Sequence, residues 1–363
     1  MSNIIQLTLP ARNRDRAQRL TALAECFASE RRFGDDVFWL KENAEYLNIC
    51  ETGGLRLPGA ALDAYLGFYD HACERLTFFP QYYRFLLSIT LDLEDLGMPG
   101  DIGARMVETA ARQGLAEAEL SDLQRAEARR LMARRGQDEL AWDTGLDDRL
   151  RRFVGRTATF ALPNKKAAYE LTHVVFYLSE YGRRDPGLAP EAITSLTFAG
   201  VLAFLDQNAD LLAEICVALR FAGQTPPRPW EDWLDRFARD FRIETGDHVS
   251  VQDAYHDYLV TNWYLAVRGR EAFPEAPEAG RAGFTRRASF AGPLRAISDV
   301  IYRMGPMRSG DWSAMRPSLC EALDGPGCSI LMQAADSVGN FDVFFHDFAR
   351  AVCHGEPIKE AAV

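Results

Sequence analysis

The sequence predicts an all-α protein built from antiparallel helix pairs. Apolar residues recur at the three- to four-residue spacing of amphipathic helices along most of the chain. Stretches of alternating Val and Ile bounded by turn residues, which would indicate strands, do not stand out. Because short connections join the helical segments, and several segments are apolar on more than one side, we expect an α/α toroid-like ring, with a solenoid as the alternative.

The first half of the chain predicts a series of amphipathic helices. Asp35 and Asp36 can cap the second of them, and Pro58 suits the first turn of the third. An aspartate pair of this kind also resembles the magnesium-binding motif of prenyl-diphosphate enzymes, but we find no second metal-binding cluster, so capping is favoured. The expected helices span 15–31, 37–49, 58–76, 79–96, 101–113 and 117–135.

Helical periodicity resumes after a more polar stretch at 136–155. Asn164 and Ser250 can each cap a helix, and the segment 268–287, rich in Pro, Gly, Glu and Arg, is expected to be a loop. The expected helices span 165–181, 190–208, 209–221, 230–243, 251–267, 293–304, 318–323 and 340–352. We expect an N-terminal helical region over 1–160 and a C-terminal one over 161–363, or one continuous domain.

The composition argues against several classes of function. The net charge of −11 over 363 residues disfavours binding to nucleic acid or to an anionic membrane. No run of 18 uncharged residues indicates a membrane span, and the N-terminus lacks the apolar core of a signal peptide. Seven scattered cysteines without a C-x-x-C pair predict reduced thiols and a cytoplasmic protein.

Two carboxylate–histidine pairs lie in aromatic-rich helical segments. Glu170 precedes His173 by three residues, and Asp253 precedes His256 by the same spacing. Positions three apart share a face of a helix, so each pair can point at one spot. Ionisable groups are rarely buried without a partner, and these pairs therefore indicate a polar site inside the protein.

One functional interpretation is a pocket that binds or modifies a small molecule. His173 and His256 would act as acid and base, with Glu170 and Asp253 orienting the two imidazoles. Tyr177 would bind or protonate the substrate. Four further residues are expected to contact the ligand, namely Glu180, Asp257, Tyr255 and Phe176. The aromatic lining suits an apolar or aromatic molecule.

Three alternatives remain open. Carboxylate-x-x-His pairs also build di-iron sites in helical bundles, which need further carboxylates. Candidates for these are present, although spacing singles out none: Glu42, Glu74, Asp206, Asp210 and Glu214. The histidines could instead hydrogen-bond between core helices and only specify packing. The arginine-rich helix at 117–135 suggests a protein partner for a non-enzymatic interaction protein. The cofactor and the identity of any metal stay undetermined.

No phosphate-binding loop, dinucleotide fingerprint, nucleophile elbow or zincin motif occurs in the sequence. The run Leu171-Thr172-His173-Val174-Val175-Phe176-Tyr177-Leu178 with the later Ala254-Tyr255-His256 resembles a group of bacterial helical proteins described as a domain of unknown function. That resemblance covers about a third of the chain and names no activity. It implies that His173 and His256 belong to one site. Glu180 stands where the group carries Asp.

Overall fold

The protein is predominantly α-helical in its computed structural model, which describes residues 15–33, 36–137, 140–141, 143–246, 248–286 and 291–351. Helices account for 65% of the structure, and two short strands are the remaining regular elements of the described residues. The predicted all-α class is therefore confirmed. In the described part of the chain, no helix combines the length and apolarity needed to cross a bilayer.

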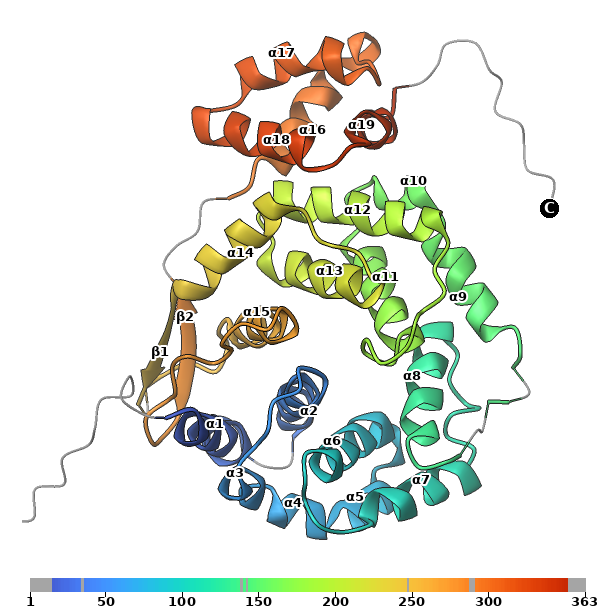
Figure 1. Cartoon of the computed structure of the whole chain (residues 1–363), viewed down its shortest axis with the longest axis vertical. Helices are drawn as coiled ribbons and strands as arrows, with labels where there is room; N and C mark the ends of the chain where they lie inside the picture. The colour runs from blue at the N-terminus through green and yellow to red at the C-terminus, as the bar shows by residue number, and fades with distance from the viewer. Residues whose placement is uncertain are drawn as a thin grey trace, which may run out of the picture.

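Six inner helices form a closed ring (Figure 1). Each packs on the next in the order α2, α6, α8, α11, α13 and α15, and α15 packs on α2 to close the ring. A ring of this kind brings the first and the last inner helices side by side, although they lie some two hundred residues apart in the sequence. The inner helices span Val37–Thr52, Tyr83–Asp95, Asp122–Ala133, Lys165–Leu178, Ala209–Phe221 and Tyr255–Val267, respectively.

Outer helices surround the ring (Figure 1). They are α1 (Arg16–Glu25) with its π-helical extension η2 (Cys26–Glu30), α3 (Gly59–Asp63), α4 (Leu66–Asp70), α5 (Ala72–Phe78), η3 (Pro80–Tyr82), α7 (Ile102–Arg112), α9 (Leu146–Val154), α10 (Thr157–Phe160), α12 (Pro190–Leu205) and α14 (Arg228–Arg239). Because both layers pack on α13, that helix is buried along almost its whole length. The expected division of the chain at residue 160 stays a prediction.

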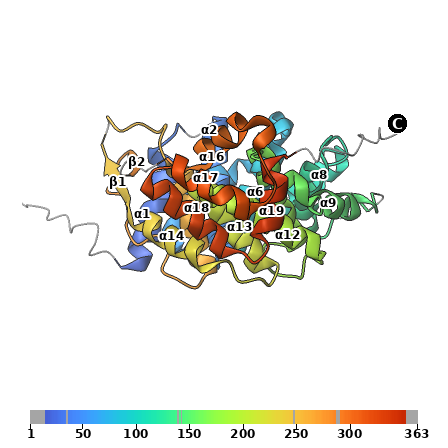
Figure 2. The ribbon, with the colours of Figure 1, turned by 90° about the horizontal axis from the view of Figure 1, so that it is seen from above.

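The last four α-helices form a group outside the ring. They are α16 (Leu294–Arg303), followed by η4 (Gly305–Met307), α17 (Trp312–Ala322), α18 (Gly325–Ser337) and α19 (Phe341–Ala349). Helix α18 contacts α12 and α14, and Figure 2 shows the group lying across that side of the ring. Its own core is aromatic, with Trp312 packed edge-on against Phe341 at 4.9 Å between ring centroids.

The expectation that the chain has no sheet is wrong for two short segments. Strand β1 (Phe241–Thr245) pairs antiparallel with β2 (Ala282–Arg286), and Phe241 lies opposite Arg286. Strand β1 was missed because it directly follows α14, so that its first residues were included in the helix expected over 230–243. Strand β2 lies in the segment expected to be a loop, and it contains Gly283, at which an added Cβ would lie 2.2 Å from Val249. A glycine that permits close packing carries little strand signal.

Five of the six inner helices differ in their bounds from the sequence expectation, and the differences in α11 and α15 affect the site. Asn164 caps α11 as expected, but the helix ends at Leu178 rather than at Tyr181. Helix α15 begins at Tyr255 rather than at Val251. Asp36 caps α2 through the backbone N–H of Trp39, whereas Asp35 lies outside the described residues.

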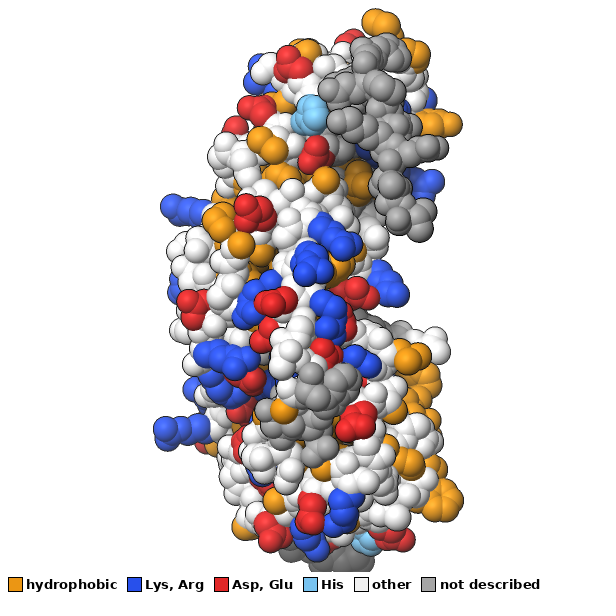
Figure 3. Space-filling model, turned by 90° about the vertical axis from the view of Figure 1, so that its right-hand side faces the viewer, with side chains coloured by type: hydrophobic (Ala, Val, Ile, Leu, Met, Phe, Trp, Pro, Cys, Tyr) orange, Lys and Arg blue, Asp and Glu red, His pale blue; other side chains and the backbone are white. Residues whose placement is uncertain are grey.

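The arginines of 117–135 are engaged within the protein instead of forming a free basic face. Arg134 pairs with Asp92 at 2.8 Å, and Arg130 lies 3.2 Å from Glu180. Arg135 lies 2.7 Å from Glu94. Basic and acidic side chains are intermingled over this side of the molecule (Figure 3). The structure therefore removes the observation from which a protein partner was inferred.

The expectation of reduced thiols is wrong for one pair. Cys320 and Cys328 form a disulfide that joins α17 to α18, and their Cα atoms lie 5.0 Å apart, which is within the usual range for a bridge. A spacing of eight residues concealed this pairing, because only the turn between the two helices brings the thiols together. Four other cysteines are free, namely Cys26, Cys50, Cys73 and Cys216, and Cys353 lies outside the described residues.

Candidate metal centre and pocket

A pocket of about 350 Å³ lies among the inner helices α2, α11, α13 and α15. Its polar lining comes from all four of these helices: Lys41, Glu45, Asn48, His173, Glu214 and His256. The volume falls within the range of small-molecule sites. His173 and His256, which are 83 positions apart in the chain, thus line one space.

Three potential metal ligands converge beside this pocket. Asp210 and Glu214 lie one turn apart on α13, and His256 lies on the first turn of α15. One ligand atom from each residue falls within 4.8 Å of the other two. Both carboxylates are almost wholly removed from water on a helix whose other core positions are apolar. Buried carboxylates at this spacing require positive charge or hydrogen-bond donors nearby.

His256 lies between two carboxylates. Its Nδ1 is 3.2 Å from Oε2 of Glu45, and its Nε2 is 3.2 Å from Oδ1 of Asp210. The other Asp210 oxygen, Oδ2, accepts a hydrogen bond of 2.6 Å from the Tyr169 hydroxyl. Oδ1 of Asp210 is buried and has no hydrogen-bond partner among the described residues, despite its proximity to His256. The contact between this oxygen and the ring is an ion pair when His256 is protonated.

His173 has a defined tautomer when neutral. Its Nδ1 lies 2.8 Å from the backbone oxygen of Tyr169, one turn earlier on α11. Because a carbonyl can only accept, Nδ1 carries the hydrogen, and the lone pair of the neutral ring is on Nε2. The nearest carboxylate to His173 is that of Glu214, whose Oε2 lies 3.8 Å from Nδ1 and accepts a 2.6 Å hydrogen bond from Thr172.

Burial and charge act in opposite directions on the pKa values of this cluster. Burial opposes protonation of His256, but Asp210 and Glu45 outweigh burial and raise its pKa well above the ordinary value. Burial would raise the pKa of Asp210, yet the neighbouring His256 lowers it. Burial raises the pKa of Glu214, and His173 only partly offsets this. When no ligand is bound, protonation of His256 or of Glu214 therefore reduces the net negative charge of this buried cluster.

Neither expected carboxylate–histidine pair forms. Glu170 lies on the partly exposed side of α11, where its carboxylate is 4.0 Å from Lys166. Asp253 precedes α15 instead of lying within it, and its carboxylate binds Arg31 at 2.8 Å. The i,i+3 rule applies only inside a helix, and it states only that two residues can share a face. The acidic neighbours of His173 and His256 come instead from α2 and α13.

The other predicted residues lie around the pocket in different roles. Phe176 lines it, whereas Tyr177 is buried edge-on against His173 with 6.0 Å between ring centroids. Tyr255 packs its ring 5.4 Å from the Arg31 guanidinium. Burial raises the pKa of Asp257, which follows His256. Glu180 lies beyond the end of α11 and pairs with Arg130.

Glu45 was missed by the sequence analysis, and Asp210 and Glu214 were not singled out. A usable signal was present for α13: two carboxylates at i,i+4 spacing on a helix whose other residues are apolar except Arg220 in the last turn. Such a pattern predicts that both acids point at a common interior partner. Glu45 carries no comparable signal, because it lies among other polar residues of α2 and is selected only by the packing of α15 on α2.

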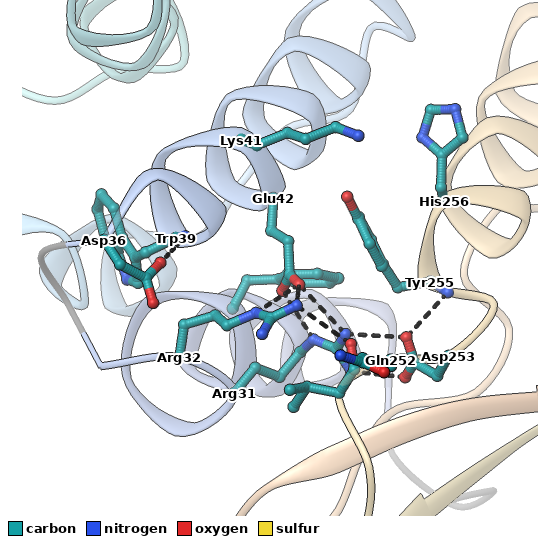
Figure 4. A network of polar contacts seen from close by, with 12 residues as sticks. Arg31, Arg32, Asp36, Trp39, Lys41, Glu42, Gln252, Asp253, Tyr255 and His256 are labelled. Carbon is teal, nitrogen blue, oxygen red and sulfur yellow. Dashed lines mark hydrogen bonds and ion pairs between the residues drawn. The ribbon is translucent and has the colours of Figure 1, made fainter. Parts of the chain in front are cut away.

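A buried network holds the start of α15 (Figure 4). Arg31, which is 2% exposed, binds Glu42 at 2.9 Å and both oxygens of Asp253 at 2.8 and 3.0 Å. Asp253 also accepts hydrogen bonds from the backbone N–H groups of Tyr255 and Phe284. The network thereby connects η2, α2, β2 and the first turn of α15, and it fixes the start of that helix one residue before His256.

A family model described as a domain of unknown function (DUF6902) matches residues 1–351. No curated protein and no solved structure matches the sequence significantly.

Proposed function

Because this chain belongs to the DUF6902 family, whose description names no activity, we propose a function from geometry: the protein binds a divalent transition-metal ion and uses it to bind and modify a small molecule in the adjoining pocket. The observation that carries the proposal is the convergence of Asp210, Glu214 and His256 within 4.8 Å. Within this group, Oδ1 of Asp210 is buried and makes no hydrogen bond among the described residues, which fits a site for a cation.

Charge balance favours a cation at this point. Three carboxylates border the pocket or its metal site (Glu45, Asp210 and Glu214), and Lys41 is the lysine in the pocket lining. With His256 neutral, the set has an excess of negative charge that a divalent ion would neutralise. An uncompensated buried carboxylate is costly, and a metal ion is one of the few partners that compensates two at once.

The donor set favours a transition metal over magnesium or calcium. Mg²⁺ and Ca²⁺ prefer all-oxygen coordination, whereas Zn²⁺, Mn²⁺ and Fe²⁺ accept imidazole nitrogen together with carboxylates. Three protein ligands leave coordination positions for water or substrate, as in catalytic metal sites. A metal there would supply Lewis acidity to a bound oxygen. His173 lies beside Glu214 with its Nδ1 hydrogen held by the backbone, so its Nε2 lone pair can serve the ligand.

The test is metal titration of the full chain after removal of bound metal with a chelator. We expect calorimetry with Zn²⁺ or Mn²⁺ to show one ion per chain. Asp210→Asn and His256→Gln should each raise the Kd for the ion by roughly tenfold or more, because each removes one of three ligands; a tenfold change corresponds to about 1.4 kcal/mol of binding free energy. Glu170→Gln is the matched control: it makes the same type of change on α11, outside the pocket, and should bind like the wild type.

Circular dichroism of each variant separates loss of binding from loss of folding. If the folded wild-type chain binds neither ion with a Kd below about 1 mM, the metal proposal is overturned. Equal binding by the wild type and by folded Asp210→Asn would also overturn it, because the ion would then lie elsewhere.

The second candidate is a metal-free acid–base site. It is favoured by the position of His256, which has a carboxylate within 3.2 Å of each ring nitrogen and so can be stabilised as an imidazolium without any ion. In that case His256 holds a proton for a substrate, and His173 receives one at Nε2. If the titration shows no metal binding, the metal-free acid–base site is the function that the pocket supports.

A further inference from the structure

One wall of the pocket is aromatic. Phe176 and Trp263 pack edge to face with 4.9 Å between ring centroids, and Tyr181 lies 5.7 Å from Phe176 and 6.0 Å from Trp263. All three line the same pocket as His173 and His256. Phe176 and Trp263 are buried, whereas Tyr181 is partly exposed, so the Tyr181 ring is the member of the wall with surface left for a ligand.

The Tyr181 ring is positioned by a strained turn. Glu180 and Tyr181 have φ values of 48° and 53°, in the left-handed region that residues with side chains rarely adopt, and Gly182 follows at 82°. A Cβ at Gly182 would lie 2.4 Å from the Phe221 ring. Two consecutive residues in this region cost free energy, and such strain concentrates at functional sites.

Dedicated contacts hold the turn in place. The Arg130 guanidinium, which is 4% exposed, lies 4.4 Å from the centroid of the Tyr181 ring and 3.2 Å from the Glu180 carboxylate. The hydroxyl of Ser179 accepts a 3.1 Å hydrogen bond from the backbone of Gly182. A buried arginine, a hydroxyl and a glycine thus act together to place one aromatic ring at the pocket.

The rest of the pocket lining is largely polar, and the space is small. Glu45, His173, Glu214 and His256 belong to this polar part, and the Lys41 amine lies 3.7 Å from Glu45. A volume of about 350 Å³ exceeds the roughly 150 Å³ that holds benzene, so a single ring fits together with polar substituents. The pocket is therefore amphipathic at the scale of one substituted ring.

From these features we propose that the ligand is a monocyclic aromatic compound with adjacent oxygen groups that coordinate a metal. The ring would pack against the wall formed by Phe176, Tyr181 and Trp263, and the oxygens would reach the ion at Asp210, Glu214 and His256. Lys41 would pair with a carboxylate on the ring. This inference rests on the proposed metal function for the oxygen groups, and on the strained turn and aromatic wall for the ring.

The test compares two probes that share chelating groups and differ in the ring. Salicylate carries a carboxylate and a phenolic hydroxyl on an aromatic ring, and glycolate carries a carboxylate and an alcoholic hydroxyl without a ring. With the Mn²⁺-loaded full chain, we expect salicylate to bind at least tenfold more tightly than glycolate by calorimetry. Tyr181→Leu should remove most of that difference while leaving Mn²⁺ binding unchanged, and Tyr181→Phe should retain it.

Tryptophan fluorescence gives a second measurement that does not depend on Tyr181. Salicylate should quench the emission of the wild type, and Trp263→Phe should lose the saturable part of that quenching. Phe153→Leu is the matched aromatic control, because Phe153 packs against Phe160 on the outer layer, 5.6 Å away, and not in the pocket wall. Circular dichroism confirms the fold of every variant.

The outcomes separate this inference from the metal proposal. If Mn²⁺ binds and salicylate binds no better than glycolate, the aromatic ligand class is overturned and the metal function stands. If no ion binds but salicylate still binds in a manner that requires the Tyr181 ring, the metal function falls and the aromatic preference stands. If Tyr181→Leu binds salicylate like the wild type, the role of the strained turn is refuted.

Discussion

Replacement of Arg31 by methionine tests whether the buried network holds the start of α15. Arg31 is the cation shared by Glu42 and Asp253, and the side chains of all three are at most 4% exposed. Removing one partner of a buried ion pair costs about 3–5 kcal/mol, because a charge is left without compensation. Glu42 keeps its 2.8 Å contact with Arg32, and Asp253 keeps two backbone donors, so we expect about 3 kcal/mol.

The assay is urea unfolding followed by circular dichroism, with the free energy of unfolding extrapolated to water. Arg32→Met is the matched control, because Arg32 is partly exposed and contacts only one of the two acids by ion pair, so about 1 kcal/mol is expected. Arg31→Met should also weaken Mn²⁺ binding, since Asp253, which Arg31 holds, lies only three residues before His256. A loss of stability below about 1 kcal/mol in Arg31→Met would refute the reasoning.

Three other perturbations have defined outcomes. Gly200→Ala should lower the free energy of unfolding by about 1–3 kcal/mol in thermal or urea melts, because its Cβ would lie 2.3 Å from the buried Trp230 ring. Gly59→Ala is the control and should be near neutral, because the space around Gly59 is open; equal effects of the two changes would contradict the packing argument. Burial would raise the pKa of Asp95, but Arg134 and Arg135 outweigh burial and lower it, so its stabilising effect is present above the unfolded pKa of about 3.9 and is lost as pH falls through the folded value. Asp95→Asn should therefore show a smaller loss of stability than the wild type between about pH 5 and pH 2, and parallel pH profiles would contradict this assignment. Mn²⁺ at a hundred times its Kd should stabilise the chain by about 2.7 kcal/mol, and a melt that does not shift on addition of a chelator to the metal-loaded protein would contradict binding to the folded state.

Local sequence patterns predicted each of the six inner helices, because each pattern acts within one segment. They missed α9 and α18, and they merged α3, α4 and α5 into one expected helix. Asn164 and Asp36 cap the helices that they were expected to cap, since a cap needs only the next three residues. The same local rules missed where α11 ends, because Arg130 from another helix helps to hold the turn at Glu180 and Tyr181. They also missed β1, whose pairing partner β2 lies about 40 residues later.

The candidate site shows the same limit of local patterns: they selected the two histidines but not the acidic residues that contact them. His173 and His256 were selected from the sequence, and they line one pocket. Their acidic neighbours were assigned to residues three positions earlier, yet Glu170 faces Lys166 and Asp253 binds Arg31. Spacing along a helix states which residues share a face, but it does not state which face meets which neighbour.

The amino-acid sequence by itself determined a helical protein and the two imidazoles around which a polar interior is built, because helical periodicity and the rarity of buried ionisable groups are local and compositional properties. Only the tertiary structure decided that Glu45, Asp210 and Glu214 surround those imidazoles. Closing the ring places α15 against both α2 and α13, and that contact depends on how every inner helix packs on the next rather than on any one segment.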